Sequence, residues 1–132
     1  MQILLKKRYV VGIIFDDQNN VLLINKLRPD TQKGMLNGIG GKIEKNETPI
    51  EAIIRECKEE TNLNIKRWKL FDEMKFDDVE IYFYYSKVTN KKILKYKSLT
   101  DEQLELCDIN NLPTNTMNDI KQKILFIVKN YK

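Results

Sequence analysis

The sequence contains no histidine, only two cysteines and no apolar run of membrane length. Without histidine, an imidazole base and Ser-His-Asp triads are excluded, so any chemistry must come from carboxylates, lysine, tyrosine or a metal. Cys57 and Cys107 form no CxxC pair, which indicates reduced thiols and argues against a zinc site. The longest apolar run, Val10–Phe15, and the short start MQILLKKRYV predict neither a bilayer span nor a secretory signal. We therefore expect a cytoplasmic protein without a membrane partner.

Acidic residues are outnumbered by basic ones, which gives the chain of 132 residues a net charge of +4. A basic balance favours anionic partners such as nucleotides or nucleic acid. The lysines are scattered, however, and no stripe of alternating basic and aromatic residues is present, so a solvated lysine surface is the ordinary alternative. The composition, 42% hydrophobic and 32% charged, is that of a globular protein, and it does not indicate an oligomeric state.

The first half of the chain begins with a predicted β-hairpin. Tyr9–Phe15 reads as a buried strand, the sequence DDQNN at residues 16–20 as a turn, and Val21–Asn25 as the second strand. Later segments with strand character are Ile65–Met74, Val79–Val88, Lys91–Lys97 and the short, partly apolar stretch Leu106–Leu112 before a turn at Pro113.

An amphipathic helix is predicted over Pro49–Thr61. Thr48 is a suitable N-cap, and Glu51 three residues later completes a capping box. Asn62 tolerates the left-handed conformation with which many helices end. One apolar stripe recurs at helical spacing and consists of Ile50, Ile53, Ile54 and Cys57.

A second amphipathic helix is predicted over Asn118–Tyr131. Strands interleaved with one central and one terminal helix predict an α+β or α/β sandwich. No internal repeat, low-complexity segment or linker interrupts the chain, so we expect residues 1–132 to form a single domain.

Three glutamates, Glu56, Glu59 and Glu60, lie within one turn of the predicted central helix. Each like-charged pair at this spacing destabilises a helix by roughly 0.2–0.5 kcal/mol. Their cluster lies about 115° from the apolar stripe on the helical wheel, beside the buried face. Carboxylates converging there suit Mg²⁺ or Mn²⁺, whereas an exposed acidic helix face is the alternative that spacing alone leaves open.

The residues around this cluster resemble the Nudix box, at residues 41–63. Gly41 is followed after five residues by Glu47 and after seven more by the sequence RECKEETNL. All charged positions match the motif at the required spacing. Two positions depart from it: Cys57 fills an apolar slot, which a buried thiol can do, and Asn62 replaces a glycine.

The resemblance extends in element order over essentially the whole chain and implies an α/β fold, the Nudix α/β/α sandwich, with a mixed central sheet. It implies hydrolysis of a nucleoside diphosphate linked to another group, with Mg²⁺ as cofactor, for which Mn²⁺ can substitute. Glu47 would pair with Arg55, which orients the acidic face. Glu56 is our first candidate for the general base, ahead of Glu102 or Asp101. The implied metal ligands are Glu56, Glu59, Glu60 and the Gly40 carbonyl.

The stretch LNGIGGKIE, residues 36–44, resembles the variant of MutT-like enzymes that act on oxidised purine nucleoside triphosphates. This implies that Asn37 contacts the base, together with Asn115 or, as second choice, Asp119. A turn residue is the ordinary alternative for Asn37, and the N-cap of the terminal helix for Asn115. Lys26 and Lys42 are candidates for binding the phosphates, and solvated lysines are the alternative for both.

Three functions follow from the resemblance. The first is a nucleoside triphosphate pyrophosphohydrolase with 8-oxo-dGTP or a related nucleotide as substrate. The second is a hydrolase of RNA 5′-triphosphate ends or dinucleoside polyphosphates, in which Tyr82, Tyr84 or Tyr85 could stack on a second base, although the same tyrosines could simply alternate across a sheet. The third is a non-catalytic Nudix-fold binding module, which the intact set of acids argues against.

Overall fold

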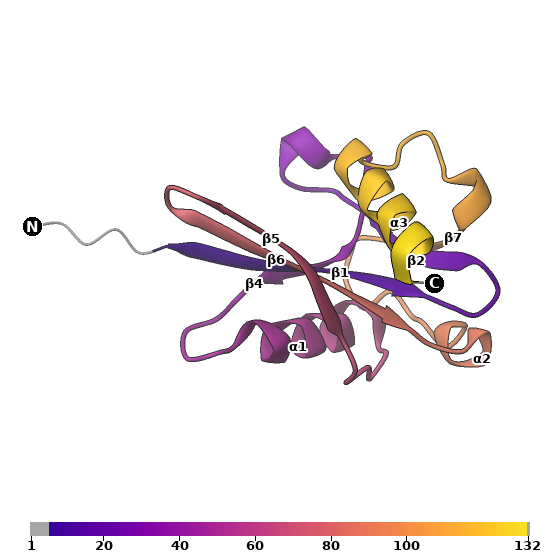
Figure 1. Cartoon of the computed structure of the whole chain (residues 1–132), viewed down its shortest axis with the longest axis horizontal. Coiled ribbons are helices and arrows are strands. Elements are labelled where there is room, and N and C mark those ends of the chain that lie inside the picture. Colours follow the sequence, from indigo (N-terminus) through magenta and orange to yellow (C-terminus); the bar gives the residue numbers. More distant parts are fainter. Residues whose placement is uncertain (1–5, 132) are drawn as a thin grey trace, which may run out of the picture.

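The computed structural model describes residues 6–131 of the chain. A mixed sheet of seven strands forms its centre, and the helices lie on both sides of it (Figure 1). The strands are β1 (Lys7–Phe15), β2 (Asn20–Asn25), β3 (Leu36–Asn37), β4 (Ile39–Lys42), β5 (Lys69–Phe76), β6 (Val79–Lys87) and β7 (Leu104–Asp108). The helices are α1 (Pro49–Thr61), α2 (Asn90–Ile93) and α3 (Asn118–Tyr131), with 3-10 turns η1 (Asp30–Gln32) and η2 (Ile109–Asn111).

The sheet runs in the order β3-β2-β1-β6-β5, with β4 added to β1 and β7 added to β2. The predicted hairpin is confirmed, because β1 pairs antiparallel with β2 through Ile14 opposite Leu22. β1 also pairs in parallel with β6 along nine residues, which makes the sheet mixed. The strand predicted at residues 79–88 is therefore confirmed to within one residue.

The strand predicted at Ile65–Met74 starts later than expected, at Lys69. The residues before it form a loop in which the indole Nε1 of Trp68 donates to the Ile65 carbonyl at 2.8 Å. Ile65 is buried in the core although it belongs to no strand. Its apolar character therefore reflects packing of a loop and not strand formation.

The strand predicted at Lys91–Lys97 is wrong, because the segment contains the short helix α2 and a turn. Thr89 caps this helix by accepting a hydrogen bond from the Lys92 amide at 3.1 Å. Asp16 fixes its first residue by accepting a hydrogen bond from Asn90 Nδ2 at 2.7 Å. Similarly, the partly apolar stretch Leu106–Leu112 is strand only as far as Asp108, after which η2 begins.

Helix α1 begins and ends at the predicted residues. The capping box is present, since the Thr48 hydroxyl accepts from the Glu51 amide at 3.3 Å and the Thr48 amide donates to Glu51 Oε1 at 3.0 Å. Asn62 ends the helix in the left-handed conformation, with φ of 63° and ψ of 12°. The local sequence signals thus suffice to define this helix.

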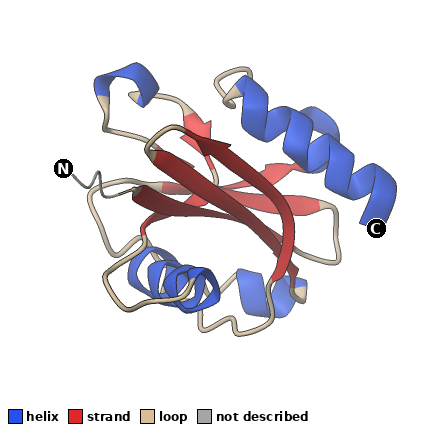
Figure 2. Cartoon of the chain, turned by 60° about the vertical axis from the view of Figure 1, so that its left-hand side comes forward, coloured by secondary structure: helices blue, strands red, loops and turns tan. Residues whose placement is uncertain are grey.

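Alternate side chains of β1 fill two separate hydrophobic cores. Ile14 packs into the core that includes Ile53 of α1, whereas Ile13 packs into the core that includes Ile124 of α3. The resulting three layers, helix–sheet–helix, are visible in Figure 2. At Gly12 an added Cβ would lie 2.6 Å from Ile53 Cδ1, so glycine allows α1 to approach the sheet. Within residues 6–131, no helix is long and apolar enough to cross a membrane.

Candidate active site

Two glycines of β4 lie directly against the acidic residues of α1. The Gly40 amide donates to Glu60 Oε1 at 2.7 Å. A Cβ added at Gly41 would lie 2.7 Å from Glu56 Oε1, so a larger residue would displace this carboxylate. Gly40 has φ of +147°, a conformation that residues with a side chain rarely adopt. The glycines therefore allow two carboxylates to approach the backbone of the sheet edge.

Glu60 is the most deeply buried acid of α1, with 8% of its surface exposed. The pKa of Glu60 is raised to about 7, chiefly by burial and also by the carboxylates of Glu56 and Glu102, while the hydrogen bond from the Gly40 amide and the charge of Lys26 act in the opposite direction. Among the described residues, no hydrogen bond reaches its second oxygen, Oε2. This oxygen is therefore available to bind a cation.

Arg55 connects Glu56 to the predicted partner Glu47. Its guanidinium donates to both Glu47 oxygens, at 2.7 and 2.9 Å, and to Glu56 Oε1 at 2.9 Å. The hydrogen bonds from Arg55 hold the pKa of Glu47 below its ordinary value. Burial raises the pKa of Glu56 in spite of Arg55, and the nearby Glu59 and Glu47 add to the increase. The pairing of Glu47 with Arg55 is present as predicted, while its role in activity stays a prediction.

The same guanidinium also contacts the more exposed acids of this segment. Glu59 Oε2 accepts from Arg55 Nη1 at 3.2 Å, and Glu44 Oε1 lies 3.7 Å from the same nitrogen. Arg55 Nη2 donates to the Lys42 carbonyl at 3.0 Å. Arg55 thus offsets part of the repulsion between the glutamates, and it gives Glu44, for which the sequence suggested no role, an ionic partner.

The predicted metal ligands do not converge on one point in this structure. Within residues 6–131, no group of three acidic, cysteine or histidine side chains lies close enough together to hold a metal ion. Glu59 instead accepts a hydrogen bond from Arg55, with 56% of its side chain exposed. The donors nonetheless fit a hard cation, because Glu56 and Glu60 are largely buried carboxylates whose pKa values burial raises, and oxygen ligands of this kind suit Mg²⁺.

The loop before β7 places a further acid near Glu60. Glu102 is 5% exposed, accepts a hydrogen bond from the Leu27 amide at 2.6 Å and pairs with Lys26 Nζ at 3.2 Å. Burial alone would raise the pKa of Glu102, but these contacts lower it. Asp101, by contrast, is exposed and pairs with Arg28 at 2.6 Å. Of the two loop acids, the structure brings Glu102 to the site and directs Asp101 elsewhere.

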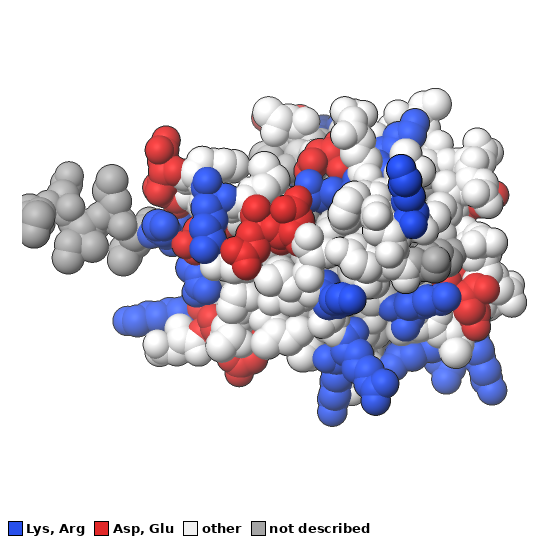
Figure 3. Space-filling model, viewed as in Figure 1, with Lys and Arg blue, Asp and Glu red and all other residues white. Residues whose placement is uncertain are grey.

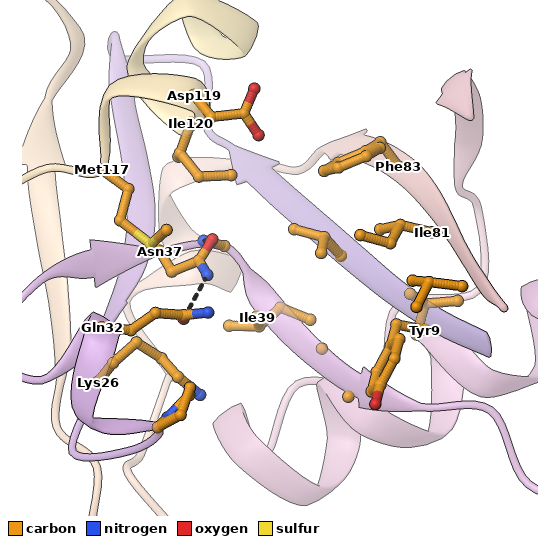
Figure 4. Close-up of a pocket in the computed structure, with 17 residues that line it drawn as sticks. Tyr9, Lys26, Gln32, Asn37, Ile39, Ile81, Phe83, Met117, Asp119 and Ile120 are labelled. Carbon is orange, nitrogen blue, oxygen red and sulfur yellow. Dashed lines mark hydrogen bonds between the residues drawn. The ribbon is translucent and has the colours of Figure 1, made fainter. Parts of the chain in front are cut away.

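A cavity of about 480 Å³ adjoins the two glycines (Figure 4). Of the predicted substrate-binding residues, Lys26, Asn37 and Asp119 line it, whereas Lys42 and Asn115 do not. Asn115 is also not the N-cap of α3, which begins three residues later, and its side-chain amide instead donates to the Gly34 carbonyl at 3.0 Å. Pockets of this size accommodate small ligands such as a nucleoside.

Several lining residues had not been predicted. Gln32 lies in η1 and Met117 in the segment between η2 and α3, where the sequence has no periodicity to indicate which side chains face a cavity. Phe83 and Ile81 could have been found, because residues of a strand at spacing two share a face. The aromatic ring of Phe83 also lies 4.3 Å from Lys123 Nζ, and this lysine pairs with Asp119 at 2.9 Å. Lys123 thus contacts both Phe83 and Asp119 at the end of the cavity near α3.

The tyrosines that could have stacked on a second base are engaged within the protein. Tyr84 is 6% exposed and belongs to the core. Tyr85 stacks on Tyr131 with ring centroids 5.5 Å apart, and Arg8 lies over the Tyr82 ring. These side chains alternate across the sheet, as in the simpler interpretation.

Comparisons with known proteins agree with this architecture. The chain is 31% identical over 72 residues to the 8-oxo-dGTP diphosphatase of Escherichia coli and 33% identical over 72 residues to that of Proteus vulgaris. These matches cover 54% of this chain and only 56% and 64% of the two relatives. A NUDIX hydrolase structure from Clostridium perfringens has a TM-score of 0.75 at 21% identity, over 96% of this chain and 99% of its own.

A MutT structure described for Aliivibrio salmonicida and Vibrio cholerae has a TM-score of 0.73 at 22% identity and covers 92% of this chain and 98% of its own. At such identities the structural likeness establishes the α/β fold with its mixed sheet and terminal helix. The model of the NUDIX domain matches residues 5–126, nearly the whole chain. The chain therefore belongs to the NUDIX family.

Proposed function

We propose that this chain is a Mg²⁺-dependent nucleoside triphosphate pyrophosphohydrolase and that residues 1–132 act as a single domain. The observation that carries the proposal is the position of two carboxylates with raised pKa values, Glu56 and Glu60, behind Gly40 and Gly41 at the edge of a nucleoside-sized cavity. The names of the two relatives support an oxidised purine deoxynucleotide, such as 8-oxo-dGTP, as substrate.

The cation would be held by Glu56, Glu59, Glu60 and the Gly40 carbonyl. When bound, Mg²⁺ neutralises phosphate charge and lowers the pKa of a coordinated water. Arg55 holds the Glu56 carboxylate in place from one side, and Glu47 in turn fixes the guanidinium with two hydrogen bonds. Glu59 has to leave Arg55 to reach the cation, and its exposed position allows this movement.

The chemical step is hydrolysis of the anhydride between the α- and β-phosphates, with water attacking one of its two phosphorus atoms. A proton passes from the water to Glu56, the water oxygen bonds to phosphorus, and the bond that joins the α- and β-phosphates through oxygen breaks, giving monophosphate and pyrophosphate. Glu102 is the alternative acceptor of the proton, because it lies near Glu60 and its lowered pKa keeps it ionised, although the same shift makes it a weaker base than Glu56. Lys26 offers a positive charge for the phosphates at the cavity wall, and Asn37 and Asp119 are placed to bind the base.

The RNA alternative has weaker support. The space-filling view shows several basic side chains near the place of α2 in Figure 1 (Figure 3). Their positive charge would attract any polyanion. The tyrosines suggested for a second base are, however, engaged within the protein. We therefore favour a mononucleotide substrate.

A panel of nucleotides incubated with Mg²⁺ tests the proposal, with pyrophosphate and orthophosphate measured separately. We expect release of pyrophosphate, most efficiently from 8-oxo-dGTP or a related purine nucleotide. A preference for 5′-triphosphorylated RNA would replace the proposed substrate with the alternative. Absence of turnover with every compound would overturn the enzymatic assignment in favour of a binding module.

A further inference from the structure

Two side-chain amides on one wall of the cavity form a chain of hydrogen bonds that begins at the backbone. The Gly38 amide donates to Asn37 Oδ1 at 2.7 Å. Because a backbone N–H can only donate, this contact assigns the oxygen of the Asn37 amide to Gly38 and its nitrogen to the other side. Asn37 Nδ2 then donates to Gln32 Oε1 at 3.1 Å.

The orientation of the Gln32 amide follows from the same argument. Its oxygen accepts from Asn37, so its nitrogen, Nε2, lies on the side away from Asn37 and extends into the cavity (Figure 4). Within residues 6–131, no hydrogen bond uses this nitrogen. Gln32 therefore presents a hydrogen-bond donor to whatever occupies the cavity, and a backbone group six residues further along the chain determines this polarity.

The backbone of Gln32 is held in place independently of its side chain. Its amide donates to the Pro29 carbonyl at 2.8 Å, and its carbonyl accepts from the Met35 amide at 2.9 Å. The residue is half-buried at the end of η1. A donor on a fixed backbone loses little freedom when it binds, which favours selective recognition.

The opposite end of the cavity has the complementary polarity. Asp119 lines it from the first turn of α3, and Lys123 binds Oδ1 of its carboxylate at 2.9 Å. An ionised carboxylate only accepts hydrogen bonds. The cavity thus combines a donor from Gln32 on one wall with an acceptor from Asp119 at the other end.

We propose that Gln32 is a specificity-determining residue that donates a hydrogen bond from Nε2 to the 6-oxo group of a purine such as guanine or 8-oxoguanine. The 6-amino group of an adenine would instead meet Nε2 donor to donor. A site with fixed hydrogen-bonding groups rejects a ligand that leaves one of them unpaired. The inference deepens the proposed function, from which it takes only the premise that the cavity holds the base of a nucleotide.

Binding of GMP and AMP, measured by calorimetry without metal, tests the inference apart from turnover. Gln32→Glu keeps an acceptor for Asn37 Nδ2 but replaces the donor with an acceptor, so we expect the affinity ratio of GMP to AMP to fall by about tenfold. Asn37→Asp leaves Gln32 unchanged but offers it an acceptor. The Gln32 amide should then rotate by half a turn, so that Nε2 donates to the new carboxylate and Oε1 points into the cavity. The affinity ratio of GMP to AMP should therefore fall, as it does in Gln32→Glu.

Gln18→Glu is the matched control, because Gln18 is exposed in the turn between β1 and β2 and does not line the cavity. It should leave the ratio unchanged, and thermal melting should show that all three variants fold. The inference is wrong if the wild-type protein binds neither nucleotide, binds both equally well, or keeps its ratio in Gln32→Glu. Selective GMP binding without pyrophosphate release from any triphosphate would instead overturn the proposed function and leave the role of Gln32 standing.

Discussion

The box segment, residues 41–63, and the cavity wall formed by residues 26–37 and 115–120 are built in different ways. In the box segment, Arg55 reaches Glu47, Glu56 and Glu59, all within eight positions of it in the sequence. In and behind the cavity wall, Lys26 pairs with Glu102 across 76 positions, and Asn115, which does not itself line the cavity, binds the Gly34 carbonyl across 81. The charged groups suited to catalysis are thus arranged by one helix and its cap, whereas the cavity wall joins segments that lie far apart in the sequence.

The largest effect on activity is expected for Glu60→Gln, in the box segment. The substitution keeps the hydrogen bond from Gly40 but removes the charge that would bind a cation, so we expect kcat/KM for pyrophosphate release to fall by about 100-fold or more. The fold should be retained and even stabilised, because a poorly compensated buried carboxylate is removed. Steady-state kinetics and thermal melting measure the two effects.

Glu73→Gln is the matched control for Glu60→Gln, since Glu73 is an exposed residue of β5 whose side chain forms an ion pair with Lys75 at the surface. It should leave activity unchanged. Mg²⁺ should raise the melting temperature of the wild-type protein but not that of Glu60→Gln. A wild-type rate in Glu60→Gln, or a wild-type melting temperature indifferent to Mg²⁺, would contradict the assigned metal role.

A smaller loss is expected for Arg55→Lys. One ammonium group cannot reproduce the two hydrogen bonds to Glu47 together with those to Glu56 and Glu59. We expect a loss of about 1–3 kcal/mol in the free energy of unfolding and a decrease of about tenfold in kcat/KM. Urea denaturation and kinetics measure both. Arg67→Lys, at an exposed position, should change neither, and equal behaviour of the two variants would mean that the guanidinium network is dispensable.

What the sequence could predict follows the same division between local and distant contacts. Thr48, Glu51 and Asn62 act through backbone groups within four residues, so the bounds of α1 could be predicted correctly. The strand predicted at Lys91–Lys97 failed because α2 depends on Asp16, which lies 74 positions from Asn90. Gln32 could not be identified as a cavity residue for the same reason, since only the folded chain brings its loop against β6 and α3.

Asp16→Asn tests the long-range contact that fixes α2. Asp16 is completely buried and accepts four hydrogen bonds, from the Gln18 amide, the Asn20 amide and side chain, and the Asn90 side chain, at 2.7–3.0 Å. An asparagine would direct its NH₂ group at one of these donors, so we expect a loss of about 1–3 kcal/mol in the free energy of unfolding at pH 7.

This loss should depend on pH. Burial alone would raise the pKa of Asp16, but the hydrogen bonds lower it below its ordinary value of 3.8. The stabilisation is therefore complete above that ordinary value and is lost as the pH falls through the lower pKa of the folded state. Urea titrations from pH 7 to pH 3 should show the difference between wild type and Asp16→Asn narrowing only below pH ~4. Asp78→Asn, at an exposed position, is the control for the substitution itself, and a pH-independent difference for Asp16→Asn would exclude an ionised Asp16 as the cause.

The smallest effect is expected at Asn62, where this chain departs from the glycine of the box. Its φ of 63° is unfavourable for residues with a Cβ, but asparagine tolerates it and glycine adopts it freely. Asn62→Ala should therefore lower the free energy of unfolding by about 1 kcal/mol, whereas Asn62→Gly should change it by less than about 0.5 kcal/mol. Asn62 also accepts a hydrogen bond from Lys58 Nζ at 3.4 Å, and both substitutions remove this contact equally. Comparison of the two variants by urea denaturation thus isolates the backbone conformation, and equal stabilities would show that the helix exit does not require a residue that tolerates positive φ.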